Sequence, residues 1–237
     1  MRSLLKTIGI LIAALCGIGL LAGAGKPLPA NAARNWNATV VKTADEGYLL
    51  GNPDAPVKLV EYISYTCPHC AHFEQESDAQ LRIGFIATGK GSIEVRSYLR
   101  NGLDVTMSLL AHCGPPSKFF GTHSALLRSQ SQWMATASTL TEAQRQRWAS
   151  PNFATGMRAV ASDLNLYEIM EKRGIERAQV DRCLADKPLA DRLAKGTKDA
   201  SEIDDINATP GFKLNGVVLA GTYSWDALKP QIEARLR

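Results

Sequence analysis

Residues 57–75 read VKLVEYISYTCPHCAHFEQ, and this stretch decides the fold. Its first half is apolar and partly β-branched, which predicts a buried strand. A helix-compatible segment begins at the two cysteines, where Pro68 suits the first turn of a helix. Cys67 then lies at a helix N-terminus, where free N–H groups and the helix dipole favour a thiolate. We interpret Cys67-Pro68-His69-Cys70 as a redox switch that cycles between dithiol and disulfide.

Two other interpretations compete for this cysteine pair. One is half of a zinc site, because His69 or His72 could add a ligand, but the chain has no second C-x-x-C. The other is an inert structural disulfide, although so short a ring removes little loop entropy from the unfolded chain. Redox chemistry explains the motif better, and we predict no metal site.

The N-terminal segment has the pattern of an export signal. Arg2 and Lys6 supply a positive region, residues 8–21 are apolar, and Ala-Asn-Ala at 30–32 is a cleavage motif. We therefore expect residues 1–32 to be a signal peptide whose removal leaves a protein of the bacterial periplasm.

An uncleaved membrane anchor is the alternative to a cleaved signal. The apolar core is shorter than the roughly 20 residues that a spanning helix needs, and Lys26, Pro27 and Pro29 interrupt it. Cys16 invites a lipoprotein interpretation, but Leu15 stands where lipidation signals prefer a small residue. Cleavage remains the favoured expectation.

Removal of the signal leaves an even set of cysteines: Cys67, Cys70, Cys113 and Cys183. Disulfides persist in an oxidising compartment such as the periplasm. Cys113 and Cys183 are therefore candidates for a second, structural disulfide that closes a long loop. Two buried free thiols are the alternative, since spacing alone does not show that the two residues are close.

The composition is that of an ordinary globular protein. Of 237 residues, 45% are hydrophobic and 21% charged, and the formal net charge is +4. The chain has no basic run with interleaved aromatic residues, so nothing supports binding to nucleic acid.

The first third of the mature chain has the pattern of a β-α-β unit. Residues 33–52 form an N-terminal arm with a possible edge strand at 39–43. A strand at 57–64, a helix from about 67 to 87 and an alternating strand at 93–99 follow.

A long helical block and a β-β-α ending complete the chain. The block has helical periodicity in the segments 105–111, 118–129, 142–148, 152–163, 166–172, 179–185 and 188–207. Strands at 212–214 and 217–219 then flank Asn215-Gly216, a strong signal for a two-residue hairpin turn. Ser224 is an N-cap candidate for a last helix over 225–236.

This order resembles the thioredoxin fold, and specifically the DsbA-like thiol:disulfide oxidoreductases of the bacterial envelope. The resemblance rests on the C-x-x-C after a strand, the helical insertion, Thr209-Pro210 before the hairpin, and the β-β-α ending. It implies an α/β protein, a thioredoxin-like domain (residues 33–100 and 205–237) with an inserted all-helical domain (residues 101–204).

The resemblance also implies roles for the residues of the motif. Cys67 is the exposed attacking thiol, Cys70 is its buried partner, and Pro68 and His69 tune the Cys67 thiolate. Glu61 is the buried acid beneath the site, which handles protons around Cys70 and whose pKa burial raises. No cofactor is implied.

Thr209 and Pro210 stand where the superfamily has a cis-proline loop, whose backbone would bind a substrate in extended form. Arg96, on the next strand, is a candidate partner of Glu61. Threonine before the proline is more typical of the DsbC and DsbG isomerases than of the oxidases, and we expect it to moderate the oxidising strength. Those isomerases need an N-terminal dimerisation domain, for which residues 33–52 are too few, so we expect a monomer.

The function that this family implies is oxidation of periplasmic proteins. Reduced or unfolded client proteins would donate their thiols to Cys67–Cys70, and a membrane partner of the DsbB type would reoxidise the enzyme. A disulfide isomerase or reductase is the first alternative, and a chaperone that binds metal through its thiolates is the second.

Overall fold

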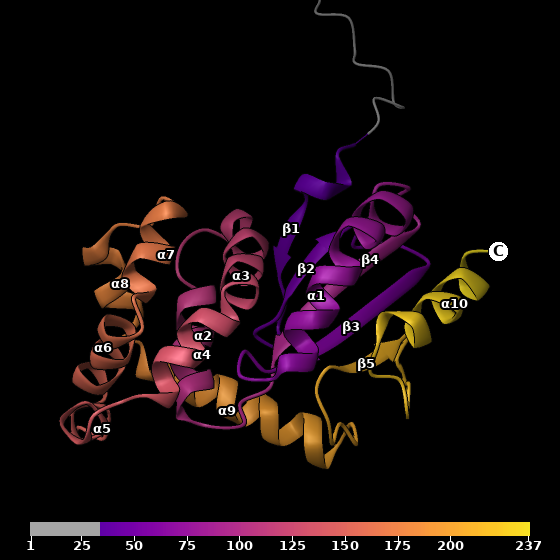
Figure 1. Ribbon diagram of the computed structural model, residues 1–237. Coiled ribbons are helices and arrows are strands. Elements are labelled where there is room, and N and C mark those ends of the chain that lie inside the picture. The colour runs from indigo at the N-terminus through magenta and orange to yellow at the C-terminus, as the bar shows by residue number, and fades with distance from the viewer. Residues whose placement is uncertain (1–33) are drawn as a thin grey trace, which may run out of the picture. The chain divides into compact units, whose positions relative to one another are not determined.

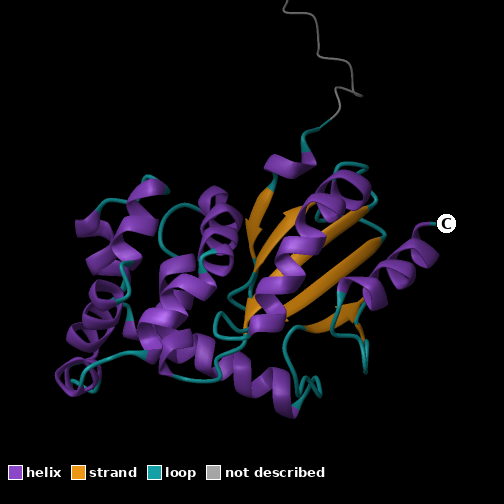
Figure 2. Ribbon diagram, in the orientation of Figure 1, coloured by secondary structure: helices purple, strands orange, loops and turns teal. Residues whose placement is uncertain are grey.

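Within residues 34–237, which the computed structural model describes, six strands form one mixed sheet in the order β1-β2-β4-β3-β5-β6. Strands β3 and β4 are parallel, and every other neighbouring pair is antiparallel (Figure 2). The strands are Val40–Lys42 (β1), Tyr48–Gly51 (β2), Val57–Ile63 (β3), Gly91–Ser97 (β4), Gly211–Leu214 (β5) and Val217–Val218 (β6). The predicted signal peptide, its cleavage motif and Cys16 lie outside the described residues.

Helices α1 and α10 lie over one face of the sheet (Figure 1), and helix α9 packs against the other. On the first face Phe73 of α1 packs against Phe212 of β5 and Trp225 of α10. On the second face Ala200 of α9 packs with Tyr62 of β3. The three helices are Pro68–Gln80 (α1), which continues as a π-helix over Leu81–Ile86 (η2), Lys187–Glu202 (α9) and Trp225–Leu236 (α10).

The helical block between β4 and β5 lies beside the sheet (Figure 1). Besides α9 it consists of Gly102–Ala111 (α2), Phe119–Arg128 (α3), Gln130–Ser138 (α4), Glu142–Trp148 (α5), Phe153–Asp163 (α6), Leu166–Lys172 (α7) and Arg177–Cys183 (α8), with a short 3-10 turn at Pro116–Lys118 (η3). Another 3-10 turn, Trp36–Ala38 (η1), precedes β1. The fold class, an α/β sheet with a helical insertion, is thus confirmed. The division at residues 101 and 204 stays a prediction, and buried side chains of both parts form one continuous hydrophobic core.

The C-terminal ending has the predicted turn and cap. Asn215 and Gly216 both have positive φ (50° and 82°), as the two-residue hairpin turn requires. The Ser224 hydroxyl accepts a hydrogen bond from the N–H of Ala227 and so caps α10.

Two elements were not expected from the sequence. Strand β2 has only four residues and runs directly into a turn, so it shows no alternation to detect. The sequence of helix α4 is too polar to give an apolar stripe, and in the structure the helix buries only Gln130 and Trp133.

The sheet register corrects one expectation. Glu61 is paired with Val95, and Tyr62 with Arg96. Since successive side chains of a strand point to opposite faces, Arg96 and Glu61 lie on different sides of the sheet. Arg96 instead forms ion pairs with Glu94 and Asp45, so its predicted pairing with Glu61 is wrong.

Candidate active site

The two cysteines of the motif lie where strand β3 passes into helix α1. Cys67 is the N-cap of α1, and Pro68 is its first residue. Both cysteines are free thiols and both are buried. Cys67 is only 2% exposed in this structure, so the expectation of an exposed thiol at this position is wrong, and Cys70 is fully buried as expected. Pro68 and His69 between them are exposed. This places the pair at a helix N-terminus, the position that the sequence predicts.

The surroundings of Cys67 favour its thiolate. Hydrogen bonds lower the pKa of Cys67 from 9.0 to about 4. The largest contribution comes from the Cys70 thiol, and the Thr209 hydroxyl and the N–H groups of Cys70 and His69 add to it. Burial of Cys67 acts in the opposite direction and raises the pKa. The Thr209 carbonyl oxygen, 3.1 Å from the sulfur, accepts a hydrogen bond from the thiol and favours the protonated form. The donors outnumber this single acceptor, so the thiolate is the stable form at neutral pH.

Cys70 and Glu61 have the opposite tendency. Burial, followed by the interaction with the Cys67 thiolate, raises the pKa of Cys70 well above its usual value, and the charge of Glu61 adds to the rise. Glu61 is 3% exposed, and burial together with the charge of Glu74 raises its pKa well above the ordinary range. The site therefore combines an ionised outer thiol with a protonated inner thiol beside a protonated acid.

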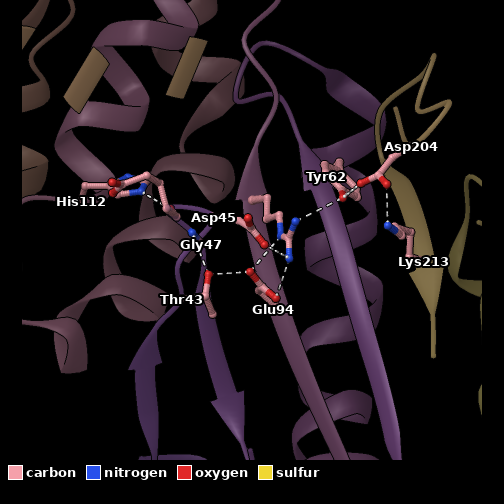
Figure 3. A network of polar contacts seen from close by, with 10 residues as sticks. Thr43, Asp45, Gly47, Tyr62, Glu94, His112, Asp204 and Lys213 are labelled. Carbon is pink, nitrogen blue, oxygen red and sulfur yellow. Dashed lines mark hydrogen bonds and ion pairs between the residues drawn. The ribbon is translucent and has the colours of Figure 1, made fainter. Parts of the chain in front are cut away.

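The peptide bond between Thr209 and Pro210 is cis, and Thr209 contacts Cys67. The loop that carries these residues is fixed at Asp204, which follows α9. Asp204 accepts hydrogen bonds of 2.7 Å from the Tyr62 hydroxyl and from the Lys213 ammonium group (Figure 3). These bonds connect the loop to β3 and β5, the two strands that flank the active site.

The network in Figure 3 continues across the same face of the sheet. The Arg96 guanidinium lies 2.8 Å from a carboxylate oxygen of Glu94 and 2.8 Å from one of Asp45. Its Cζ atom also lies over the ring of Tyr62, 5.7 Å from the ring centroid. Thr43 donates a 2.6 Å hydrogen bond to Glu94. These contacts join β4 to the turn between β1 and β2, which carries Thr43 and Asp45.

A buried carboxylate that sequence reasoning missed holds the loop before Cys67. Asp104 of α2 is fully buried and accepts hydrogen bonds from the hydroxyls of Ser64 and Thr66 and from the N–H groups of Thr66 and Arg100, all between 2.9 and 3.1 Å. The only signal in the sequence was Asn101, an N-cap that would have placed Asp104 in the first turn of a helix.

Gln130 is a second contribution of the helical block. Its side-chain amide donates hydrogen bonds to the carbonyl oxygens of Tyr65 at 2.6 Å and of Cys67 at 2.9 Å. Because the contact spans more than 60 positions of sequence, no local pattern predicts it. The inserted helices therefore hold the active-site loop as well as cover it.

Cys113 and Cys183 are joined by a disulfide with a Cα–Cα distance of 5.6 Å. It connects the end of α2 with the end of α8 and closes a loop of 70 residues. In the chain-entropy model a loop of this length stabilises the fold by about 4 kcal/mol. Within residues 34–237 no group of three or more His, Cys, Asp or Glu side chains is arranged to hold a metal ion.

The expectation that threonine moderates the oxidising strength stays a prediction, and the hydrogen bond from the Thr209 side chain to Cys67 favours the opposite effect. Since the hydroxyl hydrogen bond lowers the pKa of Cys67, replacing Thr209 by valine should raise that pKa by about one unit and make the disulfide less oxidising by about 30 mV. Thiolate absorbance at 240 nm across a pH titration measures the pKa. Thr139→Val, on an exposed residue, is the control, and an unchanged pKa in Thr209→Val would contradict the assigned hydrogen bond.

Comparison with known proteins agrees with this geometry. The family model described as thioredoxin matches residues 43–234. A solved protein-disulfide isomerase of Novosphingobium aromaticivorans is 50% identical, with a TM-score of 0.78 over 82% of this chain and all of that chain. The alpha-DsbA1 structure of Wolbachia pipientis is 24% identical, covers 79% of this chain and 89% of its own, and shares the fold with a TM-score of 0.59.

Curated relatives are more distant. A Rickettsia felis protein, provisionally named a protein-disulfide oxidoreductase, is 26% identical over 82% of this chain, and the chain spans only 62% of its length. Disulfide bond formation protein D of Bacillus subtilis is 23% identical over 80% of this chain and 77% of its own. Among residues 34–237 no helix is both long and apolar enough to span a bilayer. The chain belongs to the thioredoxin family, and its fold is that of the DsbA-like proteins.

Proposed function

We propose that this chain is an exported thiol:disulfide oxidoreductase that introduces disulfides into reduced client proteins of the periplasm. The observation that carries the proposal is the difference between the two thiols. Cys67 has a pKa of about 4, whereas burial raises the pKa of Cys70 well above its usual value. A thiolate stabilised to this degree makes the reduced form favourable and the disulfide a good oxidant.

The proposed reaction proceeds in two exchanges. A client thiolate attacks the Cys67 sulfur, the Cys67–Cys70 bond breaks, and Cys70 leaves as a thiolate that takes a proton from Glu61. The second client thiolate then attacks the client sulfur that is bonded to Cys67, and the mixed disulfide breaks. This step forms the client disulfide and releases Cys67 as a thiolate, the form that its surroundings stabilise.

The contact between Thr209 and Cys67 supports a role for the Thr209-Pro210 backbone in binding the client. Recognition through backbone hydrogen bonds to an extended segment would depend little on client sequence. A membrane partner of the DsbB type would return the enzyme to its disulfide form. The protein would act as a monomer.

Disulfide isomerisation is the second candidate, because the Novosphingobium relative at 50% identity is named a protein-disulfide isomerase. Two assays on the same client separate the two activities. The oxidised chain should form disulfides in reduced, unfolded ribonuclease and lose its own disulfide in equal amounts. Faster recovery of scrambled than of reduced ribonuclease would instead identify an isomerase.

A further inference from the structure

The loop between α9 and β5 is fixed at both ends to a single residue, Tyr62. At one end Tyr62 pairs through its backbone with Gly211, the residue that follows Pro210. At the other end the Tyr62 hydroxyl donates a 2.7 Å hydrogen bond to Asp204 (Figure 3). Residues 205–210, which include the cis peptide bond, therefore form a loop that is closed by one side chain of β3.

The inside of this loop is closely packed. Ile206 is 3% exposed and packs with Tyr62 and Ala200 in a small cluster of their own. Its N–H group donates a 2.9 Å hydrogen bond to the carbonyl oxygen of Ala200. A Cβ atom on Gly211 would lie 2.9 Å from the carbonyl oxygen of Ala208, so the loop folds back tightly onto the start of β5. Since closely packed segments transmit displacements, a movement at one end of the loop moves the other end.

The hydrogen bond between Tyr62 and Asp204 joins a neutral hydroxyl to a carboxylate. Burial and this bond raise the pKa of Tyr62 well above its usual value, so the hydroxyl keeps its proton. Burial also raises the pKa of Asp204, but the hydrogen bonds from Lys213 and Tyr62 outweigh it and lower that pKa below its usual value. A hydrogen bond to an ionised acceptor is roughly twice as strong as one between neutral groups. The closure of the loop is therefore held by a strong bond.

Thr209 is the residue of this loop that contacts Cys67. Its carbonyl oxygen lies 3.1 Å from the Cys67 sulfur, and its hydroxyl supplies one of the hydrogen bonds that lower the pKa of Cys67. A hydrogen bond weakens steeply when its atoms move apart or out of line. The contribution of the Thr209 hydroxyl to the Cys67 thiolate therefore depends on how firmly the loop is held.

We propose that Tyr62 and Asp204 are a positioning pair that holds Thr209 in hydrogen-bond contact with the Cys67 sulfur. Both residues act on Cys67 through the loop and not by direct contact. The proposal rests on the dithiol function proposed above, in which Cys67 leaves the mixed disulfide as a thiolate. The same pair fixes the Thr209 backbone that an extended client segment would bind.

The test compares Tyr62→Phe with the wild type by thiolate absorbance at 240 nm in the reduced full chain. This substitution removes the hydroxyl, keeps the ring and changes no charge. The pKa of Cys67 should rise by about half a unit, which is about a threefold loss in the ratio of thiolate to thiol. Tyr98→Phe, the same change on a residue that packs against the same cluster, is the matched control and should leave the pKa unchanged. No rise in Tyr62→Phe would contradict the proposal.

Asp204→Asn separates positioning from charge. The loss of a negative charge would by itself favour the Cys67 thiolate and lower its pKa. The loss of the positioning contact raises that pKa, so a rise supports the proposal, whereas a fall or no change overturns it. Asp199→Asn is the control for the charge, because it removes a carboxylate of α9 that pairs with Lys195 of the same helix. This control should not raise the pKa of Cys67.

A double-mutant cycle with Thr209→Val identifies the route of the effect. If Tyr62 acts through the Thr209 hydroxyl, Tyr62→Phe should shift the pKa of Cys67 in the wild-type chain but not in Thr209→Val. Equal shifts in both backgrounds would mean that Tyr62 reaches Cys67 by another route, and the positioning role would be wrong. Thermal unfolding of each variant checks that it folds, and a loss of stability alone would not move the pKa.

The pKa of Cys67 is measured without a client, so this proposal and the proposed function can fail separately. A chain that shows the expected coupling but oxidises no unfolded protein would overturn the proposed function and leave the positioning pair standing. An active oxidase in which Tyr62→Phe leaves the pKa of Cys67 unchanged would do the reverse.

Discussion

Replacing Cys67 by serine should reduce the oxidation of a reduced client by at least about a thousandfold. The reason is that Cys67 is the sulfur that the client attacks, and a serine oxygen forms no mixed disulfide. Cys70 cannot replace it, because burial raises the pKa of the Cys70 thiol well above its usual value, whereas the pKa of Cys67 is lowered to about 4. The measurement is the loss of client thiols over time with the oxidised wild type and the variant.

Cys70→Ser is the matched control for this prediction. It keeps the Cys67 sulfur and removes its partner. When Cys67 of this variant is first joined to glutathione by treatment with oxidised glutathione, the thiolate of a single-cysteine client should displace the glutathione thiolate. The resulting mixed disulfide between Cys67 and the client should accumulate and be visible by mass spectrometry. Cys67→Ser should form no such adduct. An adduct in Cys67→Ser, or full client oxidation by it, would reverse the assignment of the two thiols.

The second large effect concerns the stability of the reduced protein. The pKa of Cys67 falls from 9.0 to about 4 on folding. A group whose pKa is lowered on folding stabilises the fold fully when the pH is above its unfolded-state pKa. This contribution is lost as the pH falls to the folded-state pKa. At pH 7 the thiol is still protonated in the unfolded chain, and the pH lies three units above the folded-state pKa of Cys67. Ionisation of Cys67 therefore raises the free energy of unfolding of the reduced form by about 4 kcal/mol.

Unfolding by denaturant measures this contribution when it is repeated for the reduced and the oxidised chain. The oxidised chain has no Cys67 thiol to titrate but shares the other ionisable groups, so it serves as the control. The stability gap between the two forms should shrink by about 4 kcal/mol from pH 7 to pH 4. Equal pH dependence of both forms would mean that Cys67 has an ordinary pKa.

The sequence predicted the parts of the fold that have local signals. The apolar run before Cys67, the Asn215-Gly216 turn and the Ser224 cap each correspond to an observed feature. Strand β2 and helix α4 were missed, since the first is too short and the second too polar for periodicity to reveal them.

The residues of the active site also fall into those with a signal in the sequence and those without one. Cys67, Cys70 and Glu61 are close in sequence to one motif, and the resemblance to a family placed Thr209 and Pro210 beside it. Asp104 and Gln130 were not expected, because their importance comes from contacts between distant segments. Arg96 was misplaced because its face of the sheet depends on a register that only the structure gives.

The reduction potential of the Cys67–Cys70 pair, measured by equilibration of the full chain with glutathione buffers, tests the central claim most directly. A stabilised Cys67 thiolate predicts an oxidising value, between about −120 and −180 mV. A value near about −270 mV, in the range of thioredoxin, would contradict the proposed oxidase and identify an electron donor.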